Sequence, residues 1–398
     1  MNTEVKTVLL VDDEPANIQI VNSILKDIYK TRIATSGVKA LELANQVPAP
    51  DLILLDVMMP AMDGYEVCCR LKSADHTRDI PVIFLTGQTE IDDETRGFDV
   101  GAVDYIHKPF SPAVVQARVR THLVLRGIRE QLSRQLETIR GEMDTARQIQ
   151  LSILPPEVST IKGLDIAARY IPMTAVAGDF YDFLRIDEKR IGILVADVSG
   201  HGMPAALIAS MLKIALDGQI ACATDPARVL AGLNHALYGK FKGHFVTAAY
   251  VVVDTEKQSL LYAGAGHPPL VIMDHAARRA RHFTENGLFL GFFPQAIYTA
   301  VEIPFKAGDW GVLYTDGVLE MTDPSDEQFG LDRFKQFLQN NDGLSAGQFV
   351  DALLDELSRW SCVASGREPE DDITLLAFHF EDLAGLGHPG SDARRRHS

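Results

Sequence analysis

Residues 178–202 read GDFYDFLRIDEKRIGILVADVSGHG. Two apolar stretches flank a polar turn over 187–190, and this pattern predicts an antiparallel β-hairpin. A turn centred on Glu188 places Asp179 opposite Asp197, whereas a centre half a residue later shifts the pairing by one position. Opposed Cβ atoms in such a hairpin lie ~4.5–5.5 Å apart. Because two unneutralised carboxylates this close would destabilise the hairpin, the pairing indicates a bound metal.

Two further aspartates are placed to reach the same edge of the fold. Asp316 follows a predicted strand over 311–315, and Asp371 precedes one over 373–380. Antiparallel pairing of these strands would bring both carboxylates to one end. No cysteine or histidine set with metal-ligand spacing lies near them, so hard oxygen ligation indicates Mg²⁺ or Mn²⁺ rather than structural zinc.

The second half of the chain alternates short strands with turns rich in Gly and Asp. Helical patterns occur near 204–221 and 331–340. Gly200 and Gly202 allow a sharp turn before the first of these helices, whose N-terminus would then face the aspartates and suit an anion. The predicted fold over 154–381 is α+β, a layered antiparallel β-sandwich flanked by helices.

Four short motifs carry a family resemblance: GDFYD (178–182), DVSGHG (197–202), TDGV (315–318) and DDIT (371–374). Together they resemble the metal-dependent serine/threonine phosphatases of type 2C, in particular the SpoIIE-like bacterial branch. Two more segments, ARQIQLSILP (146–155) and GAGHPP (264–269), resemble other parts of that branch. One departure is Ala177, which stands where the branch has a first glycine before Gly178.

This resemblance implies hydrolysis of phosphoserine or phosphothreonine by a water molecule that two Mn²⁺ or Mg²⁺ ions activate. The implied ligands are the carboxylates of Asp179, Asp197, Asp316 and Asp371 and the backbone carbonyl of Val198. The family pattern favours Asp371 over Asp372, and both stay open. Residues expected near the metals in a supporting role are Asp182, His201, His267 and Asp372.

Residues 1–121 follow a different pattern. Continuous apolar runs at 8–11, 52–55 and 82–85 are typical of parallel strands that are buried on both faces, and a further strand is predicted over 103–106. A helical pattern starts near Pro15 and carries Ile18, Val21, Ile24, Leu25 and Ile28. Alternating strands and helices predict an α/β fold with a doubly wound parallel sheet of the flavodoxin-like kind.

Polar side chains stand at the ends of these strands: Asp12, Asp13, Asp56, Thr86 and Lys108. In a doubly wound parallel sheet the strand ends gather along one edge. Three carboxylates there repel one another unless a cation such as Mg²⁺ lies among them. Lysine and threonine side chains suit phosphate oxygens, so the set can form and hold an acyl phosphate.

The motifs DD (12–13), LLDVMMPAMDG (54–64) and KPF (108–110), with Thr86, resemble a response-regulator receiver domain. The resemblance implies that Asp56 accepts a phosphoryl group from a histidine kinase or a phosphotransfer protein. It further implies that Asp12, Asp13 and Asp56 hold Mg²⁺ and that Thr86, Tyr105 and Lys108 form the switch. A cis Lys108–Pro109 bond and a Tyr105 ring that turns inward on phosphorylation are expected with it.

Residues 122–153 predict one long helix that joins the two domains. Apolar residues recur at 125, 128, 132, 136, 139, 143, 146 and then at 149 or 150. The stripe predicts a parallel coiled-coil homodimer, although a strict heptad would place Gln135 in the seam where Leu136 stands. The alternative is a helix packed along its own phosphatase domain. The last segment, 382–398, is predicted to be a flexible tail.

Composition narrows the classes of protein. The chain has 398 residues, a formal net charge of −16 and 46% hydrophobic residues. The acidic balance disfavours nucleic-acid binding, and no apolar run is long enough for a membrane span or placed for a signal peptide. The four cysteines form no metal or disulfide spacing. We therefore expect a cytoplasmic protein with no DNA or membrane partner.

Both halves together predict a response regulator whose output domain dephosphorylates a partner protein. The phosphatase resemblance suggests an anti-sigma-factor antagonist as that partner. The alternative is a non-catalytic adaptor that binds a sigma factor or an anti-sigma partner through a phosphatase-like domain. The presence of all four aspartates favours the enzyme.

Overall fold

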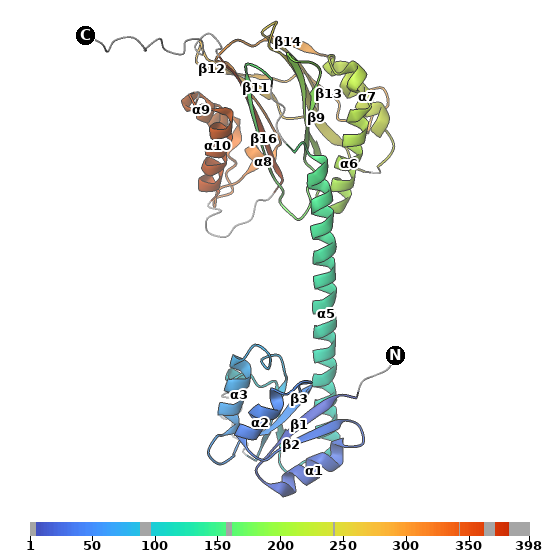
Figure 1. Ribbon diagram of the computed structural model, residues 1–398, viewed down its shortest axis with the longest axis vertical. Helices are drawn as coiled ribbons and strands as arrows, with labels where there is room; N and C mark the ends of the chain where they lie inside the picture. The colour runs from blue at the N-terminus through green and yellow to red at the C-terminus, as the bar shows by residue number, and fades with distance from the viewer. Residues whose placement is uncertain are drawn as a thin grey trace, which may run out of the picture. The chain divides into compact units, whose positions relative to one another are not determined.

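The computed structural model describes residues 5–87, 97–156, 161–241, 243–341, 343–361 and 371–381. The chain forms two compact units, Met1–Ile139 and Arg140–Ser398. One helix, α5 (Pro112–Ile153), contributes to both (Figure 1). The helix predicted over 122–153 is therefore the later part of a longer one. The predicted tail over 382–398 lies outside the described residues.

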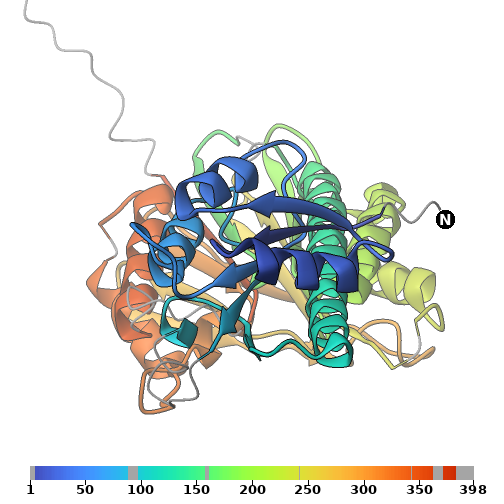
Figure 2. The same cartoon turned by 90° about the horizontal axis from the view of Figure 1, so that it is seen from below.

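The N-terminal unit is built on a five-stranded parallel sheet in the order β2-β1-β3-β4-β5. Its two faces are covered by helices, α1 and the start of α5 on one and α2 and α3 on the other (Figure 2). This confirms the predicted doubly wound fold. The elements are β1 (Thr7–Val11), α1 (Pro15–Leu25), β2 (Lys30–Ala34), α2 (Gly37–Ala44), β3 (Leu52–Asp56), α3 (Gly64–Ser73), β4 (Val82–Thr86) and β5 (Asp104–His107).

The first helix is shorter than its apolar pattern predicts. It ends at Leu25, and Ile28 lies beyond it with 48% of its surface exposed. The Ile28 N–H donates to the Leu25 carbonyl, three residues back, so the chain turns here instead of continuing the helix. The expectation that Ile28 belongs to this helix is therefore wrong.

The C-terminal unit consists of two sheets packed face to face, with helices on both outer sides (Figure 1). One sheet has the order β13-β10-β9-β8-β7, with β14 beside β10, and the other β12-β11-β15-β16-β6. Helices α6 and α7 cover the first sheet, and α9 and α10 the second. Apolar side chains from both sheets fill the space between them. The predicted α+β sandwich is confirmed.

The strands of this unit are β6 (Leu164–Ile171), β7 (Phe180–Arg185), β8 (Arg190–Val198), β9 (Val246–Asp254), β10 (Ser259–Ala265), β11 (Leu270–Asp274), β12 (Arg279–Phe283), β13 (Asn286–Gly287), β14 (Val301–Pro304), β15 (Trp310–Tyr314) and β16 (Ile373–Phe380). The helices are α6 (Met203–Asp217), α7 (Pro226–Leu237), α8 (Gly317–Glu320), α9 (Gly330–Asn340) and α10 (Ala346–Trp360), with a 3₁₀ turn at Ile220–Cys222.

Helix α6 ends at Asp217, earlier than the predicted 221, and the last of those residues belong to the 3₁₀ turn. Helices α7 and α10 were not predicted, although both carry start signals. Asp225 caps α7 by accepting the Arg228 N–H. Ser345 forms a capping box with Gln348 at the start of α10.

Residues 131–142 of α5 are exposed on every face of the helix. The exposed apolar side chains on α5 include those of the predicted stripe: Leu125 (54%), Ile128 (57%), Leu132 (54%), Leu136 (50%) and Ile139 (50%). Within the described parts of the chain, no helix is both long and apolar enough to cross a membrane.

Candidate functional site

The strand ends of the N-terminal unit bring three carboxylates together. Oxygens of Asp12, Asp13 and Asp56 all lie within 4.8 Å of one another. Lys108 reaches the same point, and its Nζ lies 3.0 Å from Asp12 Oδ2 and 3.1 Å from Asp56 Oδ1. The expected cis Lys108–Pro109 bond is present. An all-oxygen donor set of this size fits Mg²⁺.

Charge and burial oppose each other at Asp56, which is 4% exposed. Burial raises the pKa of Asp56, the hydrogen bond from Lys108 works against that rise, and the neighbouring Asp12 adds to it. Burial also works against the charged form of Lys108, but its hydrogen bonds to Asp12 and Asp56 outweigh it and raise the pKa of the amine. A divalent cation would relieve the same carboxylate repulsion.

The two other predicted switch residues lie along the neighbouring strands. Thr86 ends β4 and is 7% exposed. The Tyr105 ring, 5% exposed, packs beside Phe84 (5.6 Å between centroids) and Phe98 (5.2 Å). The Tyr105 ring therefore lies inward in this structure, and its response to phosphorylation stays a prediction.

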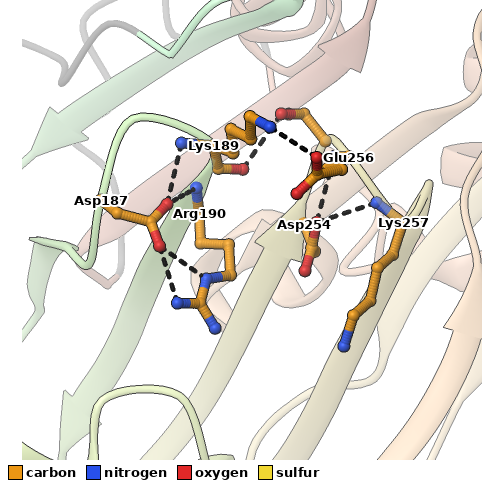
Figure 3. Close-up of polar contacts among 7 residues, drawn as sticks. Asp187, Lys189, Arg190, Asp254, Glu256 and Lys257 are labelled. Atoms are coloured by element: carbon orange, nitrogen blue, oxygen red, sulfur yellow. Dashed lines mark hydrogen bonds and ion pairs between the residues drawn. The ribbon is translucent and has the colours of Figure 1, made fainter.

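The hairpin of β7 and β8 has the predicted register. Phe180 pairs with Ala196, so the next step outward places Asp179 opposite Asp197. The register is fixed at the turn (Figure 3), where the Asp187 carboxylate accepts the backbone N–H groups of Lys189 (2.9 Å) and Arg190 (2.8 Å). The Arg190 guanidinium also donates to Asp187. Lys189 pairs with Glu256 in the β9–β10 turn, which ties the hairpin to the next strand pair.

Asp316 and Asp371 come from the second sheet. Asp316 follows β15, and Asp371 precedes β16, its antiparallel neighbour, as predicted. Thr315 connects this sheet to the hairpin, because its hydroxyl donates to Asp179 Oδ2 at 2.8 Å. The edge where the aspartates meet is therefore built by both sheets of the sandwich.

The pKa shifts show that these carboxylates repel one another. Burial raises the pKa of Asp197 to about 7, with further contributions from Asp316, Asp371 and Asp372. Burial, and next to it the charge of Asp197, raises the pKa of Asp179, which is only 2% exposed. The pKa of Asp316 is raised by burial and by Asp371. Uncompensated charge of this kind, with oxygen donors alone, fits divalent cations such as Mg²⁺ or Mn²⁺.

The spacing of these acids differs from that in the N-terminal unit. Among the described residues, Asp12, Asp13 and Asp56 form the one acidic group whose oxygens all lie within 4.8 Å. The phosphatase-type aspartates are spread more widely. A pair of cations about 3.5–4 Å apart accommodates such a spread, because each ion needs only part of the set.

Asp372 has a different environment from Asp371. It is 5% exposed, and its two carboxylate oxygens accept the backbone N–H groups of Met173 and Gly178, each at 2.7 Å. Asp371 is exposed, and its carboxylate accepts only the neighbouring Asp372 N–H among the hydrogen bonds seen in the described chain. Asp372 thus holds the loop before Asp179, which supports Asp371 as the metal ligand.

The backbone around the hairpin ends is close-packed. A Cβ on Gly178 would stand 2.8 Å from the Val198 carbonyl oxygen, so only glycine fits there. Gly200 and Gly202 have φ angles of +87° and +76°, as expected for a sharp turn before α6. Ala177 is not among the residues with positive φ, and its methyl group is therefore tolerated in place of glycine.

The three remaining predicted residues lie in unlike settings. Asp182, 4% exposed, pairs with Lys213 of α6 at 2.7 Å and accepts the Phe183 N–H. His267 is 2% exposed, its Nδ1 lies 2.9 Å from Thr247 Oγ1, and burial lowers its pKa to about 3. His201 is exposed in the turn before α6. Asp182 thus forms an ion pair with α6, and His267 forms a buried hydrogen bond with Thr247 of β9.

Comparison with known families agrees with this architecture. Residues 8–120 match the response regulator receiver domain, and residues 187–381 match stage II sporulation protein E (SpoIIE). The chain joins a receiver domain to a SpoIIE-type phosphatase domain. The second match includes Asp197, Asp316 and Asp371 and begins after Asp179.

Individual relatives cover one domain each. Phosphoserine phosphatases RsbU and RsbP of Bacillus subtilis are 32% and 30% identical to this chain over 200 and 187 residues. These matches span 50% and 46% of this chain and 57% and 46% of the relatives. A probable cyclic di-GMP phosphodiesterase of Vibrio cholerae is 50% identical over 117 residues, 29% of this chain and 26% of its own length.

A solved structure resembles the C-terminal unit. The SiaA-PP2C domain of Pseudomonas aeruginosa aligns with a TM-score of 0.56 and 26% identity, over 62% of this chain and 98% of that domain. The chain thus spans about half or less of the length of the curated relatives named here.

Proposed function

We propose that this protein is a response regulator that hydrolyses phosphoserine or phosphothreonine on a partner protein when Asp56 is phosphorylated. The observation that supports it most is the register of β7 and β8, in which Phe180 pairs with Ala196 and the next step outward brings Asp179 opposite Asp197. Asp316 and Asp371, from the second sheet, contribute to the charge that raises the pKa of Asp197. These carboxylates, with the Val198 carbonyl, would hold two Mn²⁺ or Mg²⁺ ions.

Such ions, when bound, activate a water molecule and neutralise the phosphoryl oxygens. The chain itself supplies the positioning. Thr315 orients the Asp179 carboxylate, and Asp372 fixes the backbone on its N-terminal side. The N-terminus of α6, which follows the Gly200–Gly202 turn, is suited to a phosphate group because its free backbone N–H groups favour an anion.

The receiver domain would supply the control. A phosphoryl group on Asp56 adds negative charge beside Lys108 and Thr86, at the ends of β5 and β4. Asp104 of β5 pairs with Arg118 and, at 3.1 Å, with His122, both on α5. Asp104 begins β5 and Lys108 follows its last residue, so a change at the phosphorylation site would reach these contacts with α5 along the strand.

The relatives support a proposal for the substrate class. RsbU and RsbP are named phosphoserine phosphatases, and their matches extend over 200 and 187 residues of this chain. We infer a phosphorylated protein substrate in a partner-switching pathway, of the anti-sigma-factor antagonist type, and a histidine kinase or phosphotransfer protein upstream. A homodimer through α5 and a cytoplasmic location belong to the same proposal.

The test uses the purified full chain with Mn²⁺ and a generic phosphoester, followed by a phosphorylated protein substrate. Hydrolysis should be lost on adding EDTA. It should fall by several orders of magnitude in Asp197→Ala and Asp316→Ala, while circular dichroism shows the fold retained, because removing a carboxylate relieves repulsion. Activity that survives EDTA would exclude the metal mechanism. A wild-type chain that binds Mn²⁺ yet hydrolyses neither substrate would instead support the adaptor.

A further inference from the structure

A single glutamine near the end of α5 is buried while its neighbours are not. Residues 147–149 are exposed, whereas Gln150 is 5% exposed. The predicted stripe could continue at either 149 or 150, and of these two side chains only Ile149 (61%) is exposed. Gln150 faces the phosphatase domain of its own chain.

The Gln150 amide is matched to one residue of the backbone. Its Nε2 donates to the Ala177 carbonyl at 2.6 Å, and its Oε1 accepts the Ala177 N–H at 3.0 Å. Ala177 is 0% exposed, so water cannot replace either bond. The Gln150 side chain therefore forms hydrogen bonds with both the backbone N–H and the backbone carbonyl of Ala177, a buried residue in the loop before β7.

That loop leads directly to a proposed metal ligand. The next residue, Gly178, donates its N–H to Asp372 at 2.7 Å and leaves no room for a side chain against the Val198 carbonyl. Asp179 follows, with its carboxylate held by Thr315. The backbone of Ala177 is thus hydrogen-bonded to α5, and the backbone of Gly178 is hydrogen-bonded to Asp372, the residue before β16.

We propose that Gln150 is a positioning residue of the metal site, which sets the place of Asp179 through Ala177. The inference rests on the proposed function, because it treats Asp179 as a metal ligand. It also names the contact through which α5 acts on that ligand. If the end of α5 rotates or moves, Gln150 takes Ala177 with it or releases it, and the Asp179 carboxylate shifts in either case.

A purely structural role must be separated from this one. A buried glutamine that only satisfies two backbone groups would affect stability when replaced, and it would leave metal binding in the folded protein unchanged. Partners that orient metal ligands typically change metal affinity by about 10–100-fold when they are removed. Metal affinity, measured well below the unfolding temperature, therefore distinguishes the two roles.

The experiment compares Gln150→Met, which keeps the length but loses both hydrogen bonds, with Gln150→Glu, which can still accept the Ala177 N–H. The matched control is Gln148→Met, an exposed position in the same turn of α5. All full-length proteins carry Asp13→Ala and Asp56→Ala, so that the receiver site does not bind the ion. Free Mn²⁺ is measured by electron paramagnetic resonance, and backbone N–H exchange of Ala177 by mass spectrometry.

We expect Gln150→Met to raise the Mn²⁺ dissociation constant about tenfold or more and to accelerate exchange at Ala177. Gln150→Glu, whose buried carboxylate would face the Ala177 carbonyl, should also raise the constant, and Gln148→Met should change neither quantity. Should Gln150→Met fail to fold, the Gln150→Glu comparison decides. An unchanged Mn²⁺ constant beside faster exchange at Ala177 would overturn the inference.

The two proposals fail in distinguishable ways. If the chain with Gln150 intact binds Mn²⁺ but the wild type hydrolyses no phosphoester, the proposed function is wrong and the comparison of Mn²⁺ constants still decides the role of Gln150. Suppose instead that the wild type is active and that Gln150→Met and Gln150→Glu both bind Mn²⁺ as tightly as the protein with Gln150 intact. In that case this inference alone is wrong.

Discussion

The hydroxyl of Thr315 donates a 2.8 Å hydrogen bond to the carboxylate of Asp179, and the two residues belong to different sheets of the sandwich. The same hydroxyl accepts the Thr374 N–H at 2.9 Å, at the start of β16. Thr315 is 0% exposed. One buried threonine therefore links the hairpin that carries Asp179 and Asp197 to the strand pair that carries Asp316 and Asp371.

Replacing Thr315 with Val should weaken metal binding at Asp179 and also destabilise the domain. The Thr374 N–H would lose its acceptor, at a cost of about 1–3 kcal/mol. Loss of the hydrogen bond to the carboxylate should raise the Mn²⁺ dissociation constant roughly tenfold or more. Thr315→Ser, which keeps the hydroxyl, is the matched control and should resemble the wild type. Calorimetric titration and thermal unfolding check both effects, and equal behaviour of Val and Ser would contradict the role of the hydroxyl.

The pair Asp371→Ala and Asp372→Ala should separate metal binding from loop structure. Asp371→Ala removes the proposed metal ligand, so we expect activity to be lost. Because this carboxylate is exposed and repels Asp197, we expect the free energy of unfolding to stay nearly unchanged. Asp372→Ala leaves the N–H groups of Met173 and Gly178 without their acceptor and should lower the free energy of unfolding by about 1–3 kcal/mol for each. A larger loss of Mn²⁺ affinity in Asp372→Ala, with both variants folded, would show that Asp372 is the ligand.

The stability of the metal-free protein should depend on pH through Asp197. Its pKa rises from 3.8 to about 7 on folding, so the folded state holds the proton more tightly than the unfolded chain. The free energy of unfolding should therefore fall as pH rises from about 4 to about 7, while Mn²⁺ affinity rises over the same range.

Tryptophan fluorescence in a denaturant titration with EDTA measures this effect, because both tryptophans, Trp310 and Trp360, belong to the phosphatase domain. Asp197→Asn should weaken the dependence of the free energy of unfolding on pH. Part of the dependence should remain, because the pKa values of Asp179 and Asp316 are raised as well. An equal slope in wild type and Asp197→Asn would disprove the assignment to Asp197.

The exposed stripe on α5 should mediate dimerisation. Light scattering of the full chain at micromolar concentration should give the mass of a dimer. Leu132→Lys with Leu136→Lys should give a monomer, because two charges would enter the seam. The control is Thr138→Lys with Thr145→Lys, which adds the same charge at exposed positions on the opposite face. A monomeric wild type, with or without phosphorylation, would count decisively against the dimer.

Beryllofluoride, which mimics a phosphoryl group on Asp56, should raise the phosphatase rate in wild type and have no effect in Asp56→Ala. We expect partial activation, since moving an equilibrium from 1% to 99% takes about 5.5 kcal/mol and one pair of receivers can supply less. Gln135→Leu should favour the strict-heptad register and make the rate insensitive to beryllofluoride. An equal response in wild type and Asp56→Ala would refute the coupling.

Local patterns in the sequence predict much of this protein. The turn at 187–190 sets the register that places Asp179 opposite Asp197, because turn geometry and strand alternation leave few other pairings. The acidic cluster of the receiver follows from parallel topology alone. Helices α7 and α10 were missed although their caps at Asp225 and Ser345 were present, so the signal existed in the sequence.

Only the tertiary structure decided how the metal site is supported. Thr315 and Asp179 are 136 residues apart, Asp372 and Gly178 are 194 apart, and Gln150 and Ala177 are 27 apart across the end of α5. These contacts form when the two sheets and the helix pack together, and no local period or turn specifies them. The sequence alone therefore predicts that Asp179, Asp197, Asp316 and one of Asp371 and Asp372 gather at one edge. The separate roles of Asp371 and Asp372, and the direction in which Gln150 faces, depend on burial and on which backbone N–H groups need an acceptor.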